Sequence, residues 1–152
     1  MILDVLGQID IEAAYKLLEN EQIPGWLSMP RLGATTIWES WEGPYNQQGA
    51  GAGSLNHYSK GAVCAWLFTT MCGIRADGEN HFTIAPQPGG SLTHASASYQ
   101  SLYGKVESKW EKTESGYIFT VTVPANCEAE VYLPDGSKHL QSPGTVTYTT
   151  ET

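Results

Sequence analysis

The spacing of apolar residues along the chain changes near residue 75, and this change is the main sign of its organisation. Residues 10–21 carry apolar side chains at the three- and four-residue spacing of one helix face. These are Ile11, Ala14, Leu17 and Leu18. Because Pro24-Gly25 interrupts a helix, the pattern predicts one amphipathic helix that ends before this pair.

Residues 54–72 predict a second and more apolar helix. Ser54 is a typical N-cap residue, and Lys60 is the only Lys, Arg, Asp or Glu in the segment. Its apolar positions are Leu55, Tyr58, Ala62, Val63, Trp66, Leu67 and Met71. A helix that is apolar on nearly every side must be covered on most of them, and the other short helical pieces here are too few to do so. We expect structure other than these short helical pieces to cover the helix predicted over residues 54–72.

Between these helices, residues 35–41 predict a short helix, because Thr36 is followed three residues later by Glu39, the spacing of a capping box. The glycine run at residues 49–53 lacks the Gly-Lys-Ser/Thr ending of a phosphate-binding loop, and no predicted strand precedes it. It therefore predicts a flexible loop that reorients the chain between helices.

After residue 78 the pattern turns to alternation, which is typical of half-buried antiparallel strands. In residues 105–111 the charged side chains share one face, and Val106 and Trp110 share the other. Turn residues at 114–116 and 134–136 separate further strands. We count at least five strands and predict an α+β protein: helices over residues 1–75, then an antiparallel β-sandwich over residues 76–152.

The charge balance argues against a polyanionic partner. The chain has 16 Asp and Glu against 8 Lys and Arg, a formal net charge of −8, and its basic residues are scattered. Nucleic acids are normally bound by a basic face. No run approaches the ~20 apolar residues of a membrane span, and the first residues do not resemble a signal peptide. We expect a soluble protein that binds neither nucleic acid nor membrane.

Cys64, Cys72 and Cys127 predict three small buried thiols rather than a disulfide framework. No Cys-x-x-Cys or His-x-x-x-His spacing suggests a metal site. We therefore expect neither a metal nor a cofactor.

Glu39 is the first candidate for chemistry, because it stands between Trp38 and Trp41. A carboxylate beside aromatic walls is suited to activating water against a sugar ring, and either tryptophan could stack on that ring. The alternative is the capping box, in which Glu39 would bond the Thr36 amide. Glu42 cannot complete a catalytic pair with Glu39, because on one helix both carboxylates would approach the glycosidic bond from the same side of the sugar ring.

His57 is the second candidate. It falls in the first turn of the helix predicted over residues 54–72, where the helix dipole disfavours the protonated ring. Both nitrogens of a neutral imidazole could then bond a sugar hydroxyl. The alternative is a packed histidine that bonds a loop carbonyl.

Several motifs occur in an order that resembles the C-terminal part of the bacterial α-L-rhamnosidases of glycoside hydrolase family 78. They are GATTIWESW at 33–41, SLNHY at 54–58, CGI at 72–74, FTIAPQPGG at 82–90, ASY at 97–99 and YG at 103–104. The resemblance covers roughly residues 5 to 133.

The resemblance implies an (α/α)6 barrel followed by a C-terminal β-sandwich. It implies inverting hydrolysis of terminal α-L-rhamnosides, with one glutamic acid protonating the leaving oxygen and another glutamate activating water. It carries the water-activating role onto Glu39 and a rhamnose-contacting role onto His57, and so favours the catalytic interpretation of Glu39 over the capping box.

The sequence departs from the family in what it lacks. Twelve barrel helices of about 11–12 residues need well over two hundred residues, and only about 75 are present. The family's general acid belongs to upstream segments, so we expect a fragment that carries the base alone and does not hydrolyse rhamnosides. Its partners would be rhamnose-containing glycosides in the complete enzyme, and either the missing part of the barrel or a second copy at its exposed helical face. The alternative is a non-catalytic β-sandwich with a helical adaptor or dimer interface.

Overall fold

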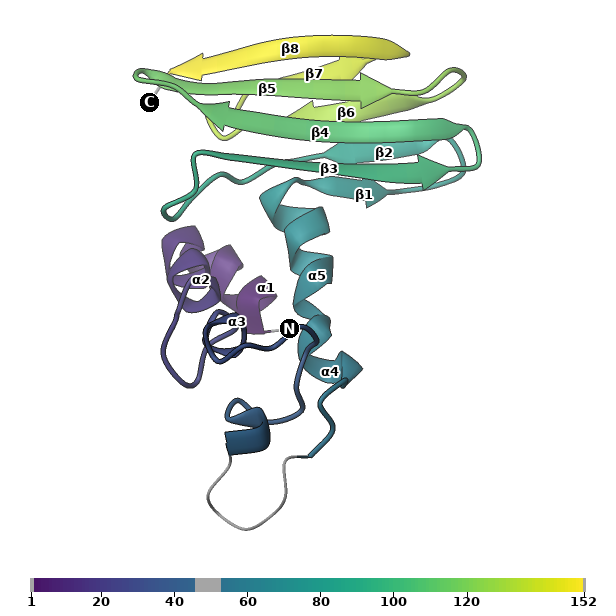
Figure 1. Cartoon of the computed structure of the whole chain (residues 1–152). Helices are drawn as coiled ribbons and strands as arrows, with labels where there is room; N and C mark the ends of the chain where they lie inside the picture. The colour runs from purple at the N-terminus through teal and green to yellow at the C-terminus, as the bar shows by residue number, and fades with distance from the viewer. Residues whose placement is uncertain (1, 46–52, 152) are drawn as a thin grey trace. The chain divides into compact units, whose positions relative to one another are not determined.

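The computed structural model describes residues 2–45 and 53–151 and separates into two compact units, Met1–Ala65 and Trp66–Thr152 (Figure 1). The first unit is helical and the second is built from strands. The prediction of helices followed by a β-sandwich is therefore confirmed. Residues 49–52 of the predicted glycine loop lie outside the described residues.

The first unit consists of short helices. They are α1 (Ile2–Ile9), α2 (Ile11–Leu18), α3 (Ser28–Arg31), the 3₁₀ turn η1 (Gly43–Tyr45), α4 (Tyr58–Gly61) and α5 (Val63–Trp66), which runs into the second unit. The predicted amphipathic helix is confirmed as α2, and Asp10 caps it by accepting the amides of Glu12 and Ala13 at 3.0 and 3.3 Å. α1 was not predicted. The two helices pack together, and Leu3, Ala14 and Tyr15 on them are completely buried.

The prediction of one helix over residues 54–72 is wrong. The segment contains α4, α5 and a π-helical turn, η2 (Leu67–Met71), and the N-cap of α4 is His57 rather than Ser54. Residues 54–57 cannot begin a helix, because the Ser54 carbonyl accepts the Glu39 amide and the His57 amide donates to the Ile37 carbonyl, both at 2.8 Å. These backbone groups are committed to a different part of the chain.

The second unit contains two four-stranded sheets. One has the order β1 (Ile74–Ala76), β2 (His81–Ile84), β6 (Glu128–Tyr132), β7 (Lys138–Gln141), and the other β3 (His94–Ser101), β4 (Gly104–Lys112), β5 (Gly116–Val123), β8 (Gly144–Glu151). The described residues thus form eight strands, three more than the minimum predicted. The expectation of antiparallel pairing fails at β2 and β6, which are parallel. The chain leaves this sheet after β2 and returns after building β3 to β5, and such a crossover permits parallel pairing.

The core of the sandwich is apolar and closed. The side chains of Ile84, Val106, Trp110, Phe119, Val121, Ala129 and Val131 are fully buried. As predicted from alternation in residues 105–111, Val106 and Trp110 face this core. The Trp110 indole Nε1 donates to the Met71 carbonyl at 2.9 Å, so the one polar atom of this large side chain is satisfied.

A buried amide links the two sheets. Gln141 of β7 is 3% exposed, and its Nε2 donates to the carbonyls of Val121 and Gly144, both at 3.0 Å. Its Oε1 accepts from the Tyr148 hydroxyl at 3.1 Å. Every polar atom of the Gln141 side chain therefore has a partner, as a buried amide requires.

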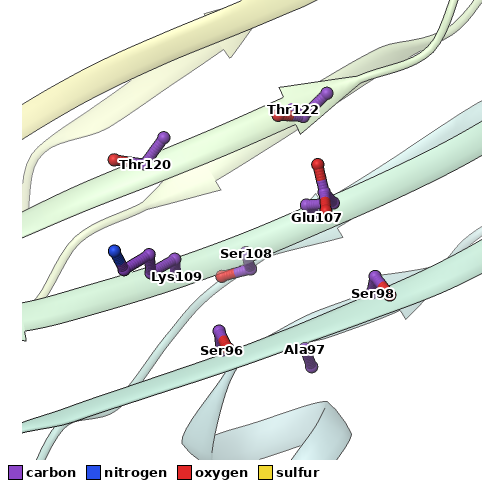
Figure 2. A pocket seen from close by; sticks show the side chains of 8 residues that line it. All are labelled: Ser96, Ala97, Ser98, Glu107, Ser108, Lys109, Thr120 and Thr122. Carbon is purple, nitrogen blue, oxygen red and sulfur yellow. The ribbon is translucent and has the colours of Figure 1, made fainter.

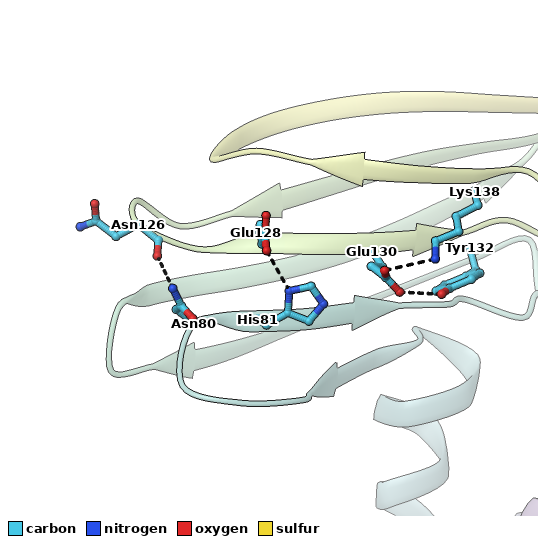
Figure 3. A network of polar contacts seen from close by, with 7 residues as sticks. All are labelled: Asn80, His81, Asn126, Glu128, Glu130, Tyr132 and Lys138. Carbon is cyan, nitrogen blue, oxygen red and sulfur yellow. Dashed lines mark hydrogen bonds and ion pairs between the residues drawn. The ribbon is translucent and has the colours of Figure 1, made fainter.

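A polar network covers the outer face of the β2, β6 and β7 sheet (Figure 3). The Glu130 carboxylate accepts from the Tyr132 hydroxyl at 2.6 Å and from Lys138 Nζ at 3.1 Å. His81 Nδ1 lies 3.5 Å from the Glu128 carboxylate on the neighbouring strand. The Tyr132 hydrogen bond, and then that of Lys138, lowers the pKa of Glu130 below its usual value.

All three thiols are free, but only two are buried. Cys72 and Cys127 are 3% and 4% exposed, whereas Cys64 is exposed on α5, so the prediction of three buried thiols is wrong for Cys64. Burial raises the pKa of the Cys72 thiol to about 11, because it penalises the thiolate.

Candidate active site

The two predicted site residues lie on segments that are hydrogen-bonded to each other. The Glu39 amide donates to the Ser54 carbonyl, and the His57 amide donates to the Ile37 carbonyl. The two segments run antiparallel, and one contributes an extra residue between the two bonds, as in a β-bulge. The fold therefore holds the backbones of Glu39 and His57 in a fixed relation, although they are 18 positions apart in the sequence.

The predicted helix over residues 35–41 is absent, and the capping box with it. The Thr36 hydroxyl donates to the Leu55 carbonyl. Oε2 of Glu39 accepts instead from the Ser54 amide at 2.7 Å. A hydrogen bond to an ionised acceptor is among the stronger kinds, so this bond orients the carboxylate.

Gly53 makes room for the Glu39 carboxylate. Its φ is +62°, and a Cβ at this position would lie 2.9 Å from Oε2 of Glu39. Only glycine takes this backbone conformation without steric cost. Among the described residues, Oε1 of Glu39 has no hydrogen-bond partner, and the residue is exposed. Within the part of the chain that the structure describes, one carboxylate oxygen is thus anchored and the other has no partner.

Lys60 also holds the backbone of Glu39 in place. Its ammonium donates to the Glu39 carbonyl and lies 4.6 Å from the centre of the Trp41 ring. Trp26 donates from Nε1 to the Lys60 carbonyl at 3.0 Å and meets Trp41 edge to face at 5.5 Å. Cation–π and aromatic contacts of this kind add to the polar bonds that fix the loop.

The two tryptophans beside Glu39 have different surroundings. Trp38 is 5% exposed and packs against Gly43, where a Cβ would lie 2.1 Å from the indole. Trp38 therefore belongs to the core of the unit and cannot stack on a sugar. Trp41 is half-buried and already contacts Trp26 and Lys60.

His57 presents one ring nitrogen rather than two. Its Nδ1 accepts the Ser59 amide at 3.2 Å and lies 2.8 Å from the Ser59 hydroxyl, and its ring stacks on Tyr58 at 5.2 Å. A nitrogen that accepts an amide proton carries none itself, so we assign the proton of the neutral ring to Nε2. The expectation that both ring nitrogens of His57 are available to a sugar hydroxyl is wrong. The alternative, a histidine bonded to a loop carbonyl, is also wrong for Nδ1, whose partner is the Ser59 amide.

Sequence reasoning missed the residues that hold Glu39, which are Gly53, Ser54 and Lys60. A main-chain amide such as that of Ser54 leaves no trace in the sequence. Lys60 could have been noticed in the sequence, because it is the only Lys, Arg, Asp or Glu in the apolar segment 54–72.

Within the described residues, no three His, Cys, Asp or Glu side chains gather in a way that could hold a metal ion. In the same part of the chain, no helix has the length and apolar character that crossing a membrane requires.

Both halves of the chain match models of one protein family. Residues 1–71 match the bacterial alpha-L-rhamnosidase 6 hairpin glycosidase domain, and residues 73–147 match the bacterial alpha-L-rhamnosidase C-terminal domain. The chain belongs to the bacterial alpha-L-rhamnosidase family. An alpha-L-rhamnosidase of Formosa agariphila is 40% identical over 146 residues, and one of Streptomyces avermitilis is 35% identical over 138 residues.

Solved structures of rhamnosidases agree with this membership. The Streptomyces avermitilis alpha-L-rhamnosidase complexed with L-rhamnose matches 98% of the chain with a TM-score of 0.87 and 30% identity. The Aspergillus terreus alpha-L-rhamnosidase matches 96% of it with a TM-score of 0.88 and 29% identity.

The similarity covers only part of each relative. The chain matches 92% and 88% of its own length to the two curated rhamnosidases but spans 16% and 13% of theirs. It spans 17% and 18% of the two solved chains. The activity of the whole rhamnosidases is therefore a proposal for this chain.

Proposed function

We propose that this chain supplies the water-activating half of a glycoside hydrolase site that removes terminal α-L-rhamnose with inversion, and that Glu39 is the general base. The observation that supports this best is the state of its carboxylate, with Oε2 held by the Ser54 amide and Oε1 unpaired among the described residues. A general base must be oriented and must keep an oxygen free for the proton that it takes.

In an inverting reaction, a water oxygen bonds to the anomeric carbon on the face opposite the glycosidic oxygen, and the glycosidic bond breaks as the new bond forms. In our proposal, the proton of that water passes to Oε1 of Glu39. The departing oxygen takes a proton from a separate acid, about 6.5–9.5 Å from the base. We assign no residue of this chain to the acid.

We propose that His57 binds a rhamnose hydroxyl through Nε2–H. Two contacts support this role: the Ser59 amide leaves the proton on Nε2, and the Tyr58 ring limits rotation of the imidazole. A donor whose tautomer and orientation are already set loses little freedom when it binds.

We further propose that residues 1–75 belong to the barrel and residues 76–152 to the sandwich, and that another part of the barrel covers α1. Ile2, Val5 and Ile9 lie on one face of α1 and are 58%, 59% and 81% exposed. The same apolar face would also suit the alternative function, an adaptor or dimer interface. Sedimentation velocity separates the two: concentration-dependent dimers that Val5→Lys abolishes would favour that alternative.

The first test of the catalytic proposal uses the purified 152-residue chain and an aryl α-L-rhamnoside. We expect no turnover, because loss of proton donation alone costs about 10²–10⁴ in rate. Turnover that Glu39→Gln abolishes would show that the acid is present here after all.

The second test joins these residues in frame to the upstream part of a related six-hairpin domain. We expect the first-formed sugar, seen by NMR, to be the β-anomer, and Glu39→Gln to lower kcat by about 10²–10⁴. Glu42→Gln is the matched control and should keep kcat. Equal loss in both variants would contradict the assignment of Glu39.

A further inference from the structure

The outer face of strands β3, β4 and β5 carries a hollow that has no part in the chemistry proposed above (Figure 2). Its volume is about 350 Å³, near the lower end of the ~300–1,000 Å³ of small-molecule sites. Six outward side chains line it, namely Ser96, Ser98, Glu107, Lys109, Thr120 and Thr122. All of them belong to the second unit.

The strand register arranges these six side chains as a grid. One row across the strands contains Ser98, Glu107 and Thr122, and the other contains Ser96, Lys109 and Thr120. Neighbours within a row are about 4.8 Å apart, and the rows are about 6.7 Å apart along the strands. Hydroxyl groups therefore stand on both sides of one anionic and one cationic group.

Two ion pairs keep the middle of the hollow open. Glu107 and Lys109 are close on the same face, yet Glu107 pairs with Lys105 at 2.8 Å and Lys109 pairs with Glu111 at 2.6 Å. Both partners lie further out along β4, so the two long side chains lean apart. The four charges also cancel, and the hollow presents polar groups without a net charge.

We propose that this hollow binds a neutral saccharide. Serine and threonine hydroxyls both donate and accept hydrogen bonds, while Glu107 accepts and Lys109 donates, and this set matches adjacent hydroxyls on a sugar ring. The cancelled charges give no advantage to an anion or a cation. None of the described residues that line the hollow is aromatic, so binding lacks a stacking contribution and is weak, with a Kd on the order of 1 mM.

The test is a titration of the 152-residue chain with methyl α-L-rhamnoside, followed through backbone amide NMR shifts. We expect saturable shifts in β3, β4 and β5. Shifts near Glu39 and His57 would report the proposed active site separately, and His57→Ala should remove only those. Absence of saturable shifts in the three strands would overturn the saccharide proposal, whatever happens at Glu39.

Variants locate the site. Thr120→Val with Thr122→Val keeps β-branched side chains but removes two hydroxyls, and we expect about tenfold weaker binding at roughly 0.5–1.5 kcal/mol per hydrogen bond. Ser98→Ala on β3 should weaken binding as well. Thr149→Val is the control, because it lies on the same sheet face outside the hollow. Equal binding by the double variant, or stronger shifts with the zwitterion glycine, would overturn the proposal.

Discussion

The two units of the chain differ in how they bury their large apolar side chains. The sandwich encloses Trp110 and Phe119 completely. The helical unit leaves Ile9 81% and Tyr58 87% exposed. Two sheets that face each other can close a core by themselves, whereas each short helix needs neighbours on several sides. The two sheets of the sandwich therefore close a core between them, whereas the described helices leave several large apolar side chains exposed.

Polar contacts hold the loops of the helical unit. The pairing of residues 37–39 with 54–57, the Ser54 amide on Glu39 and the Lys60 ammonium on the Glu39 carbonyl hold its loops. Such contacts fix local geometry but contribute only about 0.5–3 kcal/mol each. We therefore expect the first unit to open more easily than the second.

The largest expected effect is in the sandwich. Trp110→Ala removes a fully buried side chain and its bond to the Met71 carbonyl, and should lower the free energy of unfolding by about 3–5 kcal/mol. Urea unfolding measures this change. Leu102→Ala, at a fully exposed position, is the control and should leave the transition where it is. Similar losses in both variants would mean that the sandwich core does not carry its stability.

A smaller effect separates backbone strain from carboxylate placement in the helical unit. Gly53→Ala and Gly33→Ala both place alanine at a positive φ, which costs about 1–2 kcal/mol. Only position 53 also presses a Cβ against Glu39, since nothing lies within 4 Å of a Cβ at Gly33. We expect faster hydrogen exchange of the Ser54 amide in Gly53→Ala alone. Equal exchange in the two variants would contradict the contact.

Ser108→Ala should change the stability of the sandwich in the opposite direction. The Ser108 hydroxyl is buried in β4 and has no partner among the described residues. Removing an unsatisfied buried hydroxyl is neutral or stabilising, by up to about 1 kcal/mol. Ser142→Ala, in an exposed turn, is the matched control in the same urea experiment. A loss above that of the control would show that the hydroxyl has a partner in solution.

The smallest expected effect is on the stability of the sandwich at acidic pH. Because hydrogen bonds from Tyr132 and Lys138 lower the pKa of Glu130, its contribution is present above the unfolded pKa and is lost as the pH falls through the folded one. Glu130→Gln should flatten this part of the stability profile. Glu114→Gln, in the β4–β5 turn, is the control and should leave the stability profile unchanged. The measurement is the urea midpoint of the sandwich between neutral and acidic pH.

Much of the sandwich could be predicted, because its signal is local. The alternation in residues 105–111 placed Val106 and Trp110 inside, as the structure shows. β7 was missed, since three of its four residues are exposed and it shows little alternation. The parallel pairing of β2 with β6 depends on the path of the chain between them, which no local pattern encodes.

The candidate site was harder to predict because its contacts are not local. Residue types proposed Glu39 and His57 and the family resemblance gave them roles, but the local sequence favoured helices at both places. The helices do not form, because the backbone groups there make hydrogen bonds to positions at least 15 residues away in the sequence. The tautomer of His57 depends on the Ser59 amide, a group that every residue except proline possesses.

The strand order β3-β4-β5-β8 has a practical result for handling the protein. Both border strands are eight residues long, and their only His, Lys, Arg, Asp or Glu side chains are His94, at the start of β3, and Glu151, at the end of β8. Neither carries the lysine, proline or bulge with which many proteins discourage stacking of one molecule beside the next. The short borders β1 and β7 of the other sheet are poor templates by comparison. Concentrated samples should extend this sheet from molecule to molecule, beginning along β3 or β8.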